Sequence, residues 1–217
     1  METWRGRIQN TMTAPPTFND RILFPSTTPK TEFIPATSLA LHVYTSASNM
    51  GIRTVGEGRC QELRTIVLNL VSAYHGYLLP TDCHEVLFLF QGEWHNHRAI
   101  EAALTLEGYF TQENQHHFLQ NQDQVRLSIG IHSGEIRTET AVNEELTRHP
   151  MVAVARQLCE MNRQTPFPAV FVSSESYNQV HANANWHLES LGVFVSQDHA
   201  KRFALFAVMN KPRFLPA

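Results

Sequence analysis

The spacing of apolar residues changes several times along the chain, and each change predicts a new element. Apolar and polar residues alternate over residues 38–44, which is typical of a β-strand with one buried face. Residues 45–58 have the composition of a loop, and residues 59–74 then place apolar side chains at helical spacing. Two apolar runs flank a polar turn over residues 78–90, which is the pattern of a β-hairpin.

A second helix and a further strand complete the predicted core. Alanines and large apolar residues share one helical face over residues 97–110, and residues 125–136 alternate again as a strand. That strand is expected to end in a tight turn bounded by Gly130 and Gly134. The order strand, helix, strand, strand, helix, strand predicts a ferredoxin-like βαββαβ arrangement, an antiparallel sheet with both helices on one face. The predicted fold class is therefore α+β.

The C-terminal part of the chain predicts an extension of this core by helices and strands. A third helix is expected from about Pro150 to Asn162, and Ser173 or Ser174 is suited to cap a short helix that follows a strand. The expected strands of this extension span residues 169–174, 187–195 and 202–208.

Composition divides the chain into three parts. Residues 1–37 are rich in proline, threonine and serine without any period, so an extended or disordered leader is expected. Residues 38–210 carry the periodic patterns of one folded domain, and residues 211–217 form a short tail. A few apolar leader residues, such as Phe33 and Ile34, could dock on the domain or on a partner.

Charge and composition exclude several classes of partner. Hydrophobic residues make up 42% of the 217 residues, which suffices for a core, and the formal net charge of −3 gives no electrostatic support for nucleic-acid binding. No apolar run approaches the roughly 20 residues of a membrane span, and the N-terminus lacks the apolar block of a signal peptide. Three cysteines are too few for a disulfide framework, so reduced thiols and a cytoplasmic location are expected.

The chain holds twelve histidines, and four of them occur as close pairs. The pairs His95/His97 and His116/His117 lack the converging cysteine or carboxylate partners of a zinc site. Surface histidines at helix ends and loops are therefore expected, with no resident metal.

Several motifs, in the same order, resemble the class III adenylate and guanylate cyclases. VRLSIGIHSGEI (residues 125–136) resembles the family's apolar strand that runs into Gly-Ile-His-Thr-Gly-Glu. MVAVARQLCEMN (residues 151–162) is similar to its Val-Asn-x-Ala-Ala-Arg-Leu helix, and FPAVFVSSESYNQV (residues 167–180) is similar to the strand and helix after it. YHGYLLPTDCHEVLFLF and HRAIEAAL take the places of the family's hairpin and alanine-rich helix. The resemblance covers about Leu39 to Val208.

The resemblance implies a metal site whose first carboxylate is missing here. Class III cyclases use two aspartates to hold two divalent metals, which bind the triphosphate and activate the ribose 3′-hydroxyl. The first aspartate should lie at the end of the first strand, where Tyr44 or Thr45 stands, and no acidic residue occurs between Leu39 and Val55. The second belongs at the hairpin tip, where His84 takes its place and Glu85 replaces the following glycine. Asp82 lies two residues before this position. A shift of two residues keeps a side chain on the same face of a strand, so Asp82 could still serve as the second metal-binding aspartate.

The other positions that the resemblance marks as catalytic are altered as well. The adenine-reading lysine corresponds to Pro80, and the helix asparagine and arginine correspond to Ala153 and Gln157. Arg156 is adjacent, but on a helix it points about 100° away from Gln157. No confident catalytic residue remains, and Asp82, Glu85 and Arg156 are left as candidate nucleotide-binding residues. The retained Gly130, His132 and Gly134 are expected to be structural turn residues.

Three functions follow from these observations. The first hypothesis is a catalytically inactive cyclase homology domain that acts in signalling as a homodimer, or as a heterodimer with a cyclase-type domain. The second is a divergent adenylate or guanylate cyclase that uses Asp82 and Glu85 to hold Mg²⁺ or Mn²⁺ as its cofactor. The third is a nucleotide sensor without turnover.

Overall fold

The computed structural model describes residues 32–47, 51–53, 57–81, 85–119, 124–137, 144–165, 170–180, 186–195 and 202–210. Every described residue belongs to the unit of residues 31–217. The elements in chain order are β1(Phe33–Ala47), β2(Gly51–Arg53), α1(Glu57–Ser72), β3(Tyr77–Leu79), β4(Glu85–Gln91), α2(His95–Leu119), β5(Gln124–Arg137), the 3-10 helix η2(Glu144–Arg148), α3(Pro150–Arg163), β6(Val170–Ser173), α4(Ser174–Asn178), β7(Trp186–Val195) and β8(Arg202–Asn210). No helix within these ranges has the length and apolar character needed to cross a membrane.

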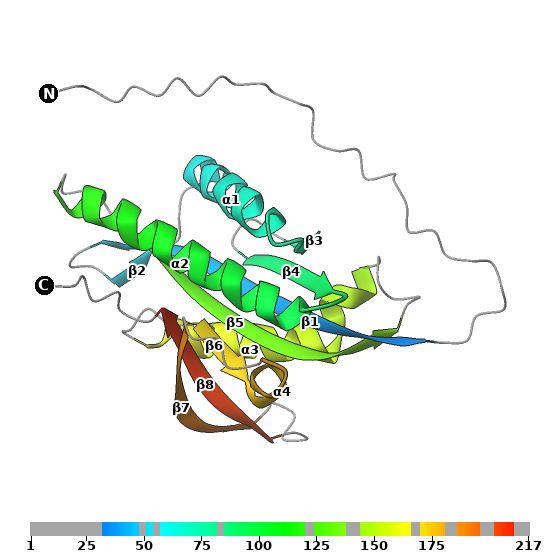
Figure 1. Ribbon diagram of the computed structural model, residues 1–217. Helices are drawn as coiled ribbons and strands as arrows, with labels where there is room; N and C mark the ends of the chain where they lie inside the picture. Colours follow the sequence, from blue (N-terminus) through cyan, green and yellow to red (C-terminus); the bar gives the residue numbers. More distant parts are fainter. Residues whose placement is uncertain are drawn as a thin grey trace, which may run out of the picture. The chain divides into compact units, whose positions relative to one another are not determined.

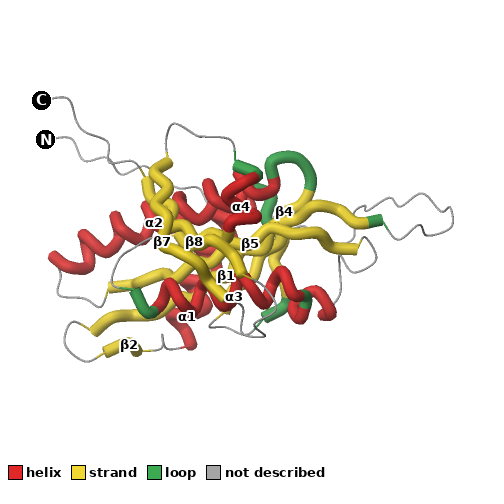
Figure 2. Tube along the Cα trace, turned by 90° about the horizontal axis from the view of Figure 1, so that it is seen from below, coloured by secondary structure: helices red, strands yellow, loops and turns green. Residues whose placement is uncertain are grey.

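The strands form one sheet in the order β3-β4-β1-β5-β6-β8-β7, with β2 paired to β1. The first four strands of this order are antiparallel neighbours, which confirms the predicted ferredoxin-like core. β6 pairs with β5 in parallel, because α3 forms the crossover between them, and β8 and β7 then continue antiparallel. The complete sheet is therefore mixed. β1 and β5 pair along their whole length and form its centre (Figure 2).

The sheet carries helices on both faces (Figure 1). α1 and α2 cover one face, as the βαββαβ pattern predicts, and α3 covers the opposite face. Alternate residues of each strand point to opposite faces, so β1 and β4 each contribute to two cores. The α1/α2 side buries Leu39, Leu41, Phe88 and Phe90, and the α3 side buries Ala36, Ala40, Leu87 and Leu89.

Two strand boundaries differ from the sequence prediction. β1 begins at Phe33, so residues 33–37, which the composition assigns to the leader, belong to the sheet. Pro35 fits there because it lies just beyond the pairing with β4, which starts at Ala36, and its missing N–H is not needed. The predicted loop after Tyr44 also contains strand, since β1 continues to Ala47 and β2 pairs with it.

The glycines of β5 are not turn residues. β5 runs without a break from Gln124 to Arg137, so the predicted turn from Gly130 to Gly134 is wrong. Gly130 instead allows α3 to contact the strand backbone, because a Cβ there would lie 2.2 Å from the Ala155 carbonyl oxygen. Gly134 has ordinary space, since its nearest neighbour would be the side chain of Met151 at 3.6 Å. Close helix packing therefore explains the first glycine only.

Candidate functional site

Glu85 and Arg156 form an ion pair at the start of β4. Glu85 lies directly across from His42 of β1 in the sheet register. Nε of Arg156 donates to Oε1 of Glu85 at 2.7 Å, and Nη2 donates to Oε2 at 2.7 Å. His42 Nε2 lies 3.8 Å from the same Oε1, and Arg156 also donates to the Thr147 carbonyl oxygen at 2.5 Å. The pair thus joins β4 to α3 and to η2.

The ion pair fixes the charge of Glu85. Only 16% of its side chain is exposed. Burial by itself would raise the pKa of Glu85, but the hydrogen bonds from His42 and Arg156 and the Arg156 charge outweigh it and lower the pKa to about 2. Glu85 is therefore an anion whose charge is balanced by a guanidinium of the same chain. In the described ranges no group of three or more His, Cys, Asp or Glu residues is arranged to hold a metal.

β1 supplies the other predicted position of this site. Tyr44 lies two residues beyond His42, so the two side chains share a face of β1. Tyr44 is buried, and burial raises the pKa of its phenol while the charge of Arg126 partly opposes the shift. β1 therefore brings an imidazole and a phenol to this region, and its sequence from Phe33 to Ala47 contains no carboxylate.

The hairpin tip lies outside the described residues. The predictions made for Asp82 and His84, and for Cys83 between them, therefore stay predictions. Thr81 is described, and its hydroxyl donates to the Glu85 carbonyl oxygen at 2.7 Å. This bond links the two sides of the hairpin beside the ion pair.

α3 presents the two altered helix positions on one side. Ala153 and Gln157 are four residues apart, so they lie one above the other on the helix. Oε1 of Gln157 is buried and has no hydrogen-bond partner among the residues that the structure describes. Arg156 points to Glu85, as expected for a residue about 100° around the helix from Gln157.

His132 is buried in β5, whereas the sequence places it in a turn. Its Nδ1 lies 2.7 Å from Oγ of Ser173, and its ring packs edge-on against Phe203 at 5.1 Å. The imidazole therefore has both a polar and an aromatic partner inside the fold. His132 is therefore not a turn residue, since it lies within β5.

A chain of buried hydrogen bonds connects α2, β1, β5 and α4. Oγ1 of Thr37 lies 2.7 Å from Nδ1 of His95 and 2.8 Å from Oγ of Ser133, which in turn donates to Ser176 at 3.0 Å. The prediction of a surface histidine is wrong for His95, which is only 8% exposed. Burial lowers the pKa of His95, and the nearby charge of Arg98 lowers it further, which favours a neutral ring. These bonds give the buried His95 ring a polar partner and join the start of α2 to the sheet.

Sequence reasoning missed His42 as a member of this site. The resemblance points only to Tyr44 and Thr45 at the end of the first strand. His42 lies two residues before Tyr44, so its side chain lies on the same face of the strand. The polar His42 in an otherwise apolar run was the available signal.

Comparisons with known proteins bear on the fold. The sequence matches no protein-family model, and a comparison with curated proteins finds no match. The adenylyl cyclase CyaB from P. aeruginosa is 10% identical with a TM-score of 0.61, over 87% of this chain and 100% of that one. The adenylate/guanylate cyclase/hydrolase from Silicibacter pomeroyi is 15% identical with a TM-score of 0.58, over 83% and 99%. The non-canonical dimeric guanylyl cyclase domain of RhoGC from Blastocladiella emersonii is 10% identical with a TM-score of 0.55, over 82% and 98%.

At these identities the likeness concerns the fold, and activity has to be argued from the site. The similarity spans nearly the whole length of each cyclase domain and agrees with the motif order in the sequence. The described part of this chain therefore has the fold of the class III adenylyl and guanylyl cyclase catalytic domains.

Proposed function

We propose that this chain is a cyclase-fold domain without cyclase activity, which acts in signalling by pairing with a second copy or with another cyclase-type domain. The observation that supports it most is the Glu85–Arg156 ion pair. The resemblance puts metal-binding carboxylates at the hairpin and at the end of β1. Here the described carboxylate of the hairpin is bound by a guanidinium, and β1 offers His42 and Tyr44.

The ion pair makes Glu85 a poor metal ligand. A Mg²⁺ or Mn²⁺ site needs several hard oxygen ligands, and both carboxylate oxygens of Glu85 already accept hydrogen bonds from Arg156. A divalent cation would have to displace the guanidinium, which would leave Arg156 without its counter-charge. Asp82 is the remaining acidic candidate, and one carboxylate does not make the two-metal site that the chemistry requires.

The residues on α3 lack the charge that the transition state needs. Ala153 has no hydrogen-bonding side chain, and Gln157 is neutral where the resemblance expects arginine. Removing one preorganised charge-stabilising donor typically lowers kcat by about 10²–10³. The replacement of both residues, together with the incomplete metal site, supports the absence of turnover.

Pairing is the function that the fold leaves in place. The RhoGC domain is described as dimeric, and the resemblance puts the active sites of class III cyclases between two domains. The side of α3 that carries Ala153 and Gln157 would then face the partner. Cys60 and Cys159 are buried and form no disulfide with each other, which supports the cytoplasmic location expected for a domain with reduced thiols.

A combined turnover and mixing experiment tests the proposal. The purified chain is incubated with ATP or GTP and Mn²⁺, and cyclic nucleotide is quantified by mass spectrometry. It is then mixed with active class III cyclase domains, and complex formation is followed by sedimentation. The proposal predicts no product from the chain alone, together with self-association or a complex. Product that disappears in Asp82→Ala would favour the divergent cyclase instead, and a monomer that binds no domain would contradict pairing.

A further inference from the structure

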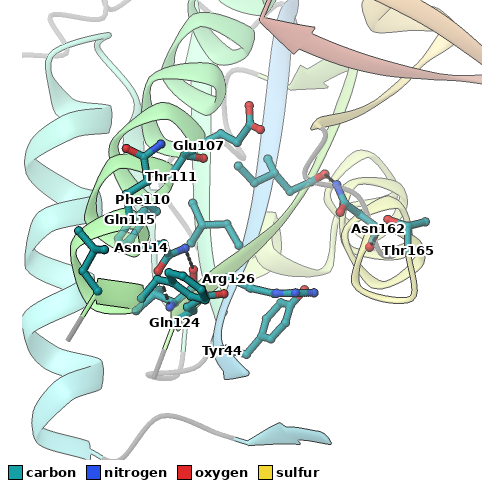
Figure 3. Close-up of a pocket in the computed structure, with 15 residues that line it drawn as sticks. Tyr44, Glu107, Phe110, Thr111, Asn114, Gln115, Gln124, Arg126, Asn162 and Thr165 are labelled. Carbon is teal, nitrogen blue, oxygen red and sulfur yellow. Dashed lines mark hydrogen bonds between the residues drawn. The ribbon is translucent and has the colours of Figure 1, made fainter. Parts of the chain in front are cut away.

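A cleft of about 510 Å³ opens between the C-terminal half of α2, the start of β5 and the end of α3 (Figure 3). Phe110, Val125 and Ile129 form its buried apolar floor. Phe118 and Arg126 lie on its exposed rim. A volume of this size is typical of pockets that bind small organic molecules.

One stripe of α2 forms a wall of this cleft. Glu107, Thr111, Asn114 and Phe118 follow one another at intervals of four, three and four residues, so they share a side of the helix. Asn114 ties this stripe to the strand, because its Nδ2 donates to the Val125 carbonyl oxygen at 2.5 Å and its Oδ1 accepts from the Val125 amide at 2.8 Å. The two bonds hold the helix over the start of β5, so the wall is built before any ligand arrives.

Glu107 is the carboxylate of this cleft. No ion pair or hydrogen bond joins its side chain to another residue of the described ranges. Burial raises the pKa of Glu107 to about 7, and no neighbouring cation opposes the shift. Arg126, the other charged residue of the lining, acts on Tyr44 instead, whose pKa it lowers. Figure 3 shows Glu107 at one end of the cleft and Arg126 beside Tyr44 at the other.

We propose that this cleft binds a small organic amine, with its apolar body on the floor and its ammonium group paired with Glu107. A half-buried carboxylate without a partner is costly, and a ligand cation would remove that cost. The apolar floor adds the burial of the hydrocarbon part. The site is separate from the Glu85–Arg156 pair, and the proposal does not depend on whether the chain turns over a nucleotide.

Isothermal titration of the full chain tests this inference with 2-phenylethylamine and its neutral isostere 2-phenylethanol. At pH 8 we expect the amine to bind about tenfold or more tightly than the alcohol. At pH 6 the ionised fraction of Glu107 falls from about nine tenths to about one tenth, so the preference should fall about ninefold. The other charged or titratable groups around the cleft are Arg126 of β5, Tyr44 of β1 and Arg163 of α3, and guanidinium and phenol groups do not change their charge over this range. Asn162 and Thr165, which also line it, are neutral.

Two variants complete the experiment. Glu107→Gln should remove the preference for the amine at both pH values, whereas Glu113→Gln, on the same helix but outside the lining, should keep it. Equal affinity for amine and alcohol, an unchanged preference in Glu107→Gln, or no binding of either probe at about 10 mM would overturn the proposal. The pH series uses the unmodified chain, so it decides the question even if a variant folds poorly.

Discussion

Glu85 and Arg156 are joined by two parallel hydrogen bonds of 2.7 Å, between the first residue of β4 and the middle of α3. Paired, planar bonds of this kind are among the stronger polar contacts in proteins. They bind the described carboxylate of the hairpin to a cation of the chain itself.

Arg156→Ala should destabilise the fold by about 1–2 kcal/mol, because it leaves the mostly buried carboxylate of Glu85 without the guanidinium that balances its charge. The value is below that of a fully buried pair since 36% of the Arg156 side chain is exposed. Arg156→Lys is the matched control, which keeps the charge but not the two-point geometry, and it should lose less. Urea unfolding measures both, and an Arg156→Ala midpoint equal to that of the parent would contradict the role of the pair.

Glu85→Gln should change the acid stability of the domain in a defined pH window. The pKa of Glu85 is lowered to about 2 in the fold, so its ionised form contributes stability above the ordinary pKa near 4.5. That contribution is lost as the pH falls through about 2. The stability difference between the parent and Glu85→Gln should therefore be fully present at about pH 5 and shrink as the pH falls from there through about 2. A difference independent of pH would show that the carboxylate charge is not involved.

Gly130→Ala should be strongly destabilising, by about 1–3 kcal/mol, because a Cβ would lie 2.3 Å from the Cys159 amide nitrogen and 2.2 Å from the Ala155 carbonyl oxygen. Helix α3 would have to move away from β5. Gly134→Ala is the matched control in the same strand, and it should be nearly neutral because its space is ordinary. Thermal melts of both variants decide the point, and equal losses at the two positions would refute the packing explanation.

Glu107→Gln should stabilise the ligand-free domain at pH 8. The folded pKa of Glu107 is raised to about 7, so its contribution is favourable below the ordinary value of 4.5 and is lost as the pH rises through 7. Allowing for partial exposure of the side chain, we expect a gain of about 1–2 kcal/mol at pH 8 and little change at pH 4. Denaturant unfolding at the two pH values measures it, and a variant less stable than the parent at pH 8 would contradict a desolvated carboxylate.

The fold could be predicted from the sequence because its signals are local. Alternation in β1 and β5 and helical spacing in α3 are visible within single segments, and their order leaves few topologies. The boundaries are harder to predict, since Phe33 to Thr37 have the composition of a leader and become strand through pairing with β5 and, from Ala36, with β4. The prediction of a turn at Gly130 is wrong for a similar reason: the helix α3 that packs against this glycine is distant in sequence.

The site could be predicted only in part. The absence of carboxylates from β1 can be read directly from the sequence. Glu85 and Arg156 are 71 positions apart in the sequence, and no local sequence pattern predicts that they form an ion pair. The part of α2 that lines the cleft could not be predicted either, because the residues after Phe110 are mostly polar and show no clear helical period of apolar residues. Contacts such as the two hydrogen bonds of Asn114 with Val125 hold this part of the helix to β5.

Titration of the purified chain with ATP, and separately with GTP, each with and without Mn²⁺, tests the central claim most directly. A domain whose carboxylate is held by Arg156 should show no nucleotide binding that depends on Mn²⁺. Binding that requires Mn²⁺ and is lost in Asp82→Ala would contradict that account, because it would demonstrate a metal site at the hairpin.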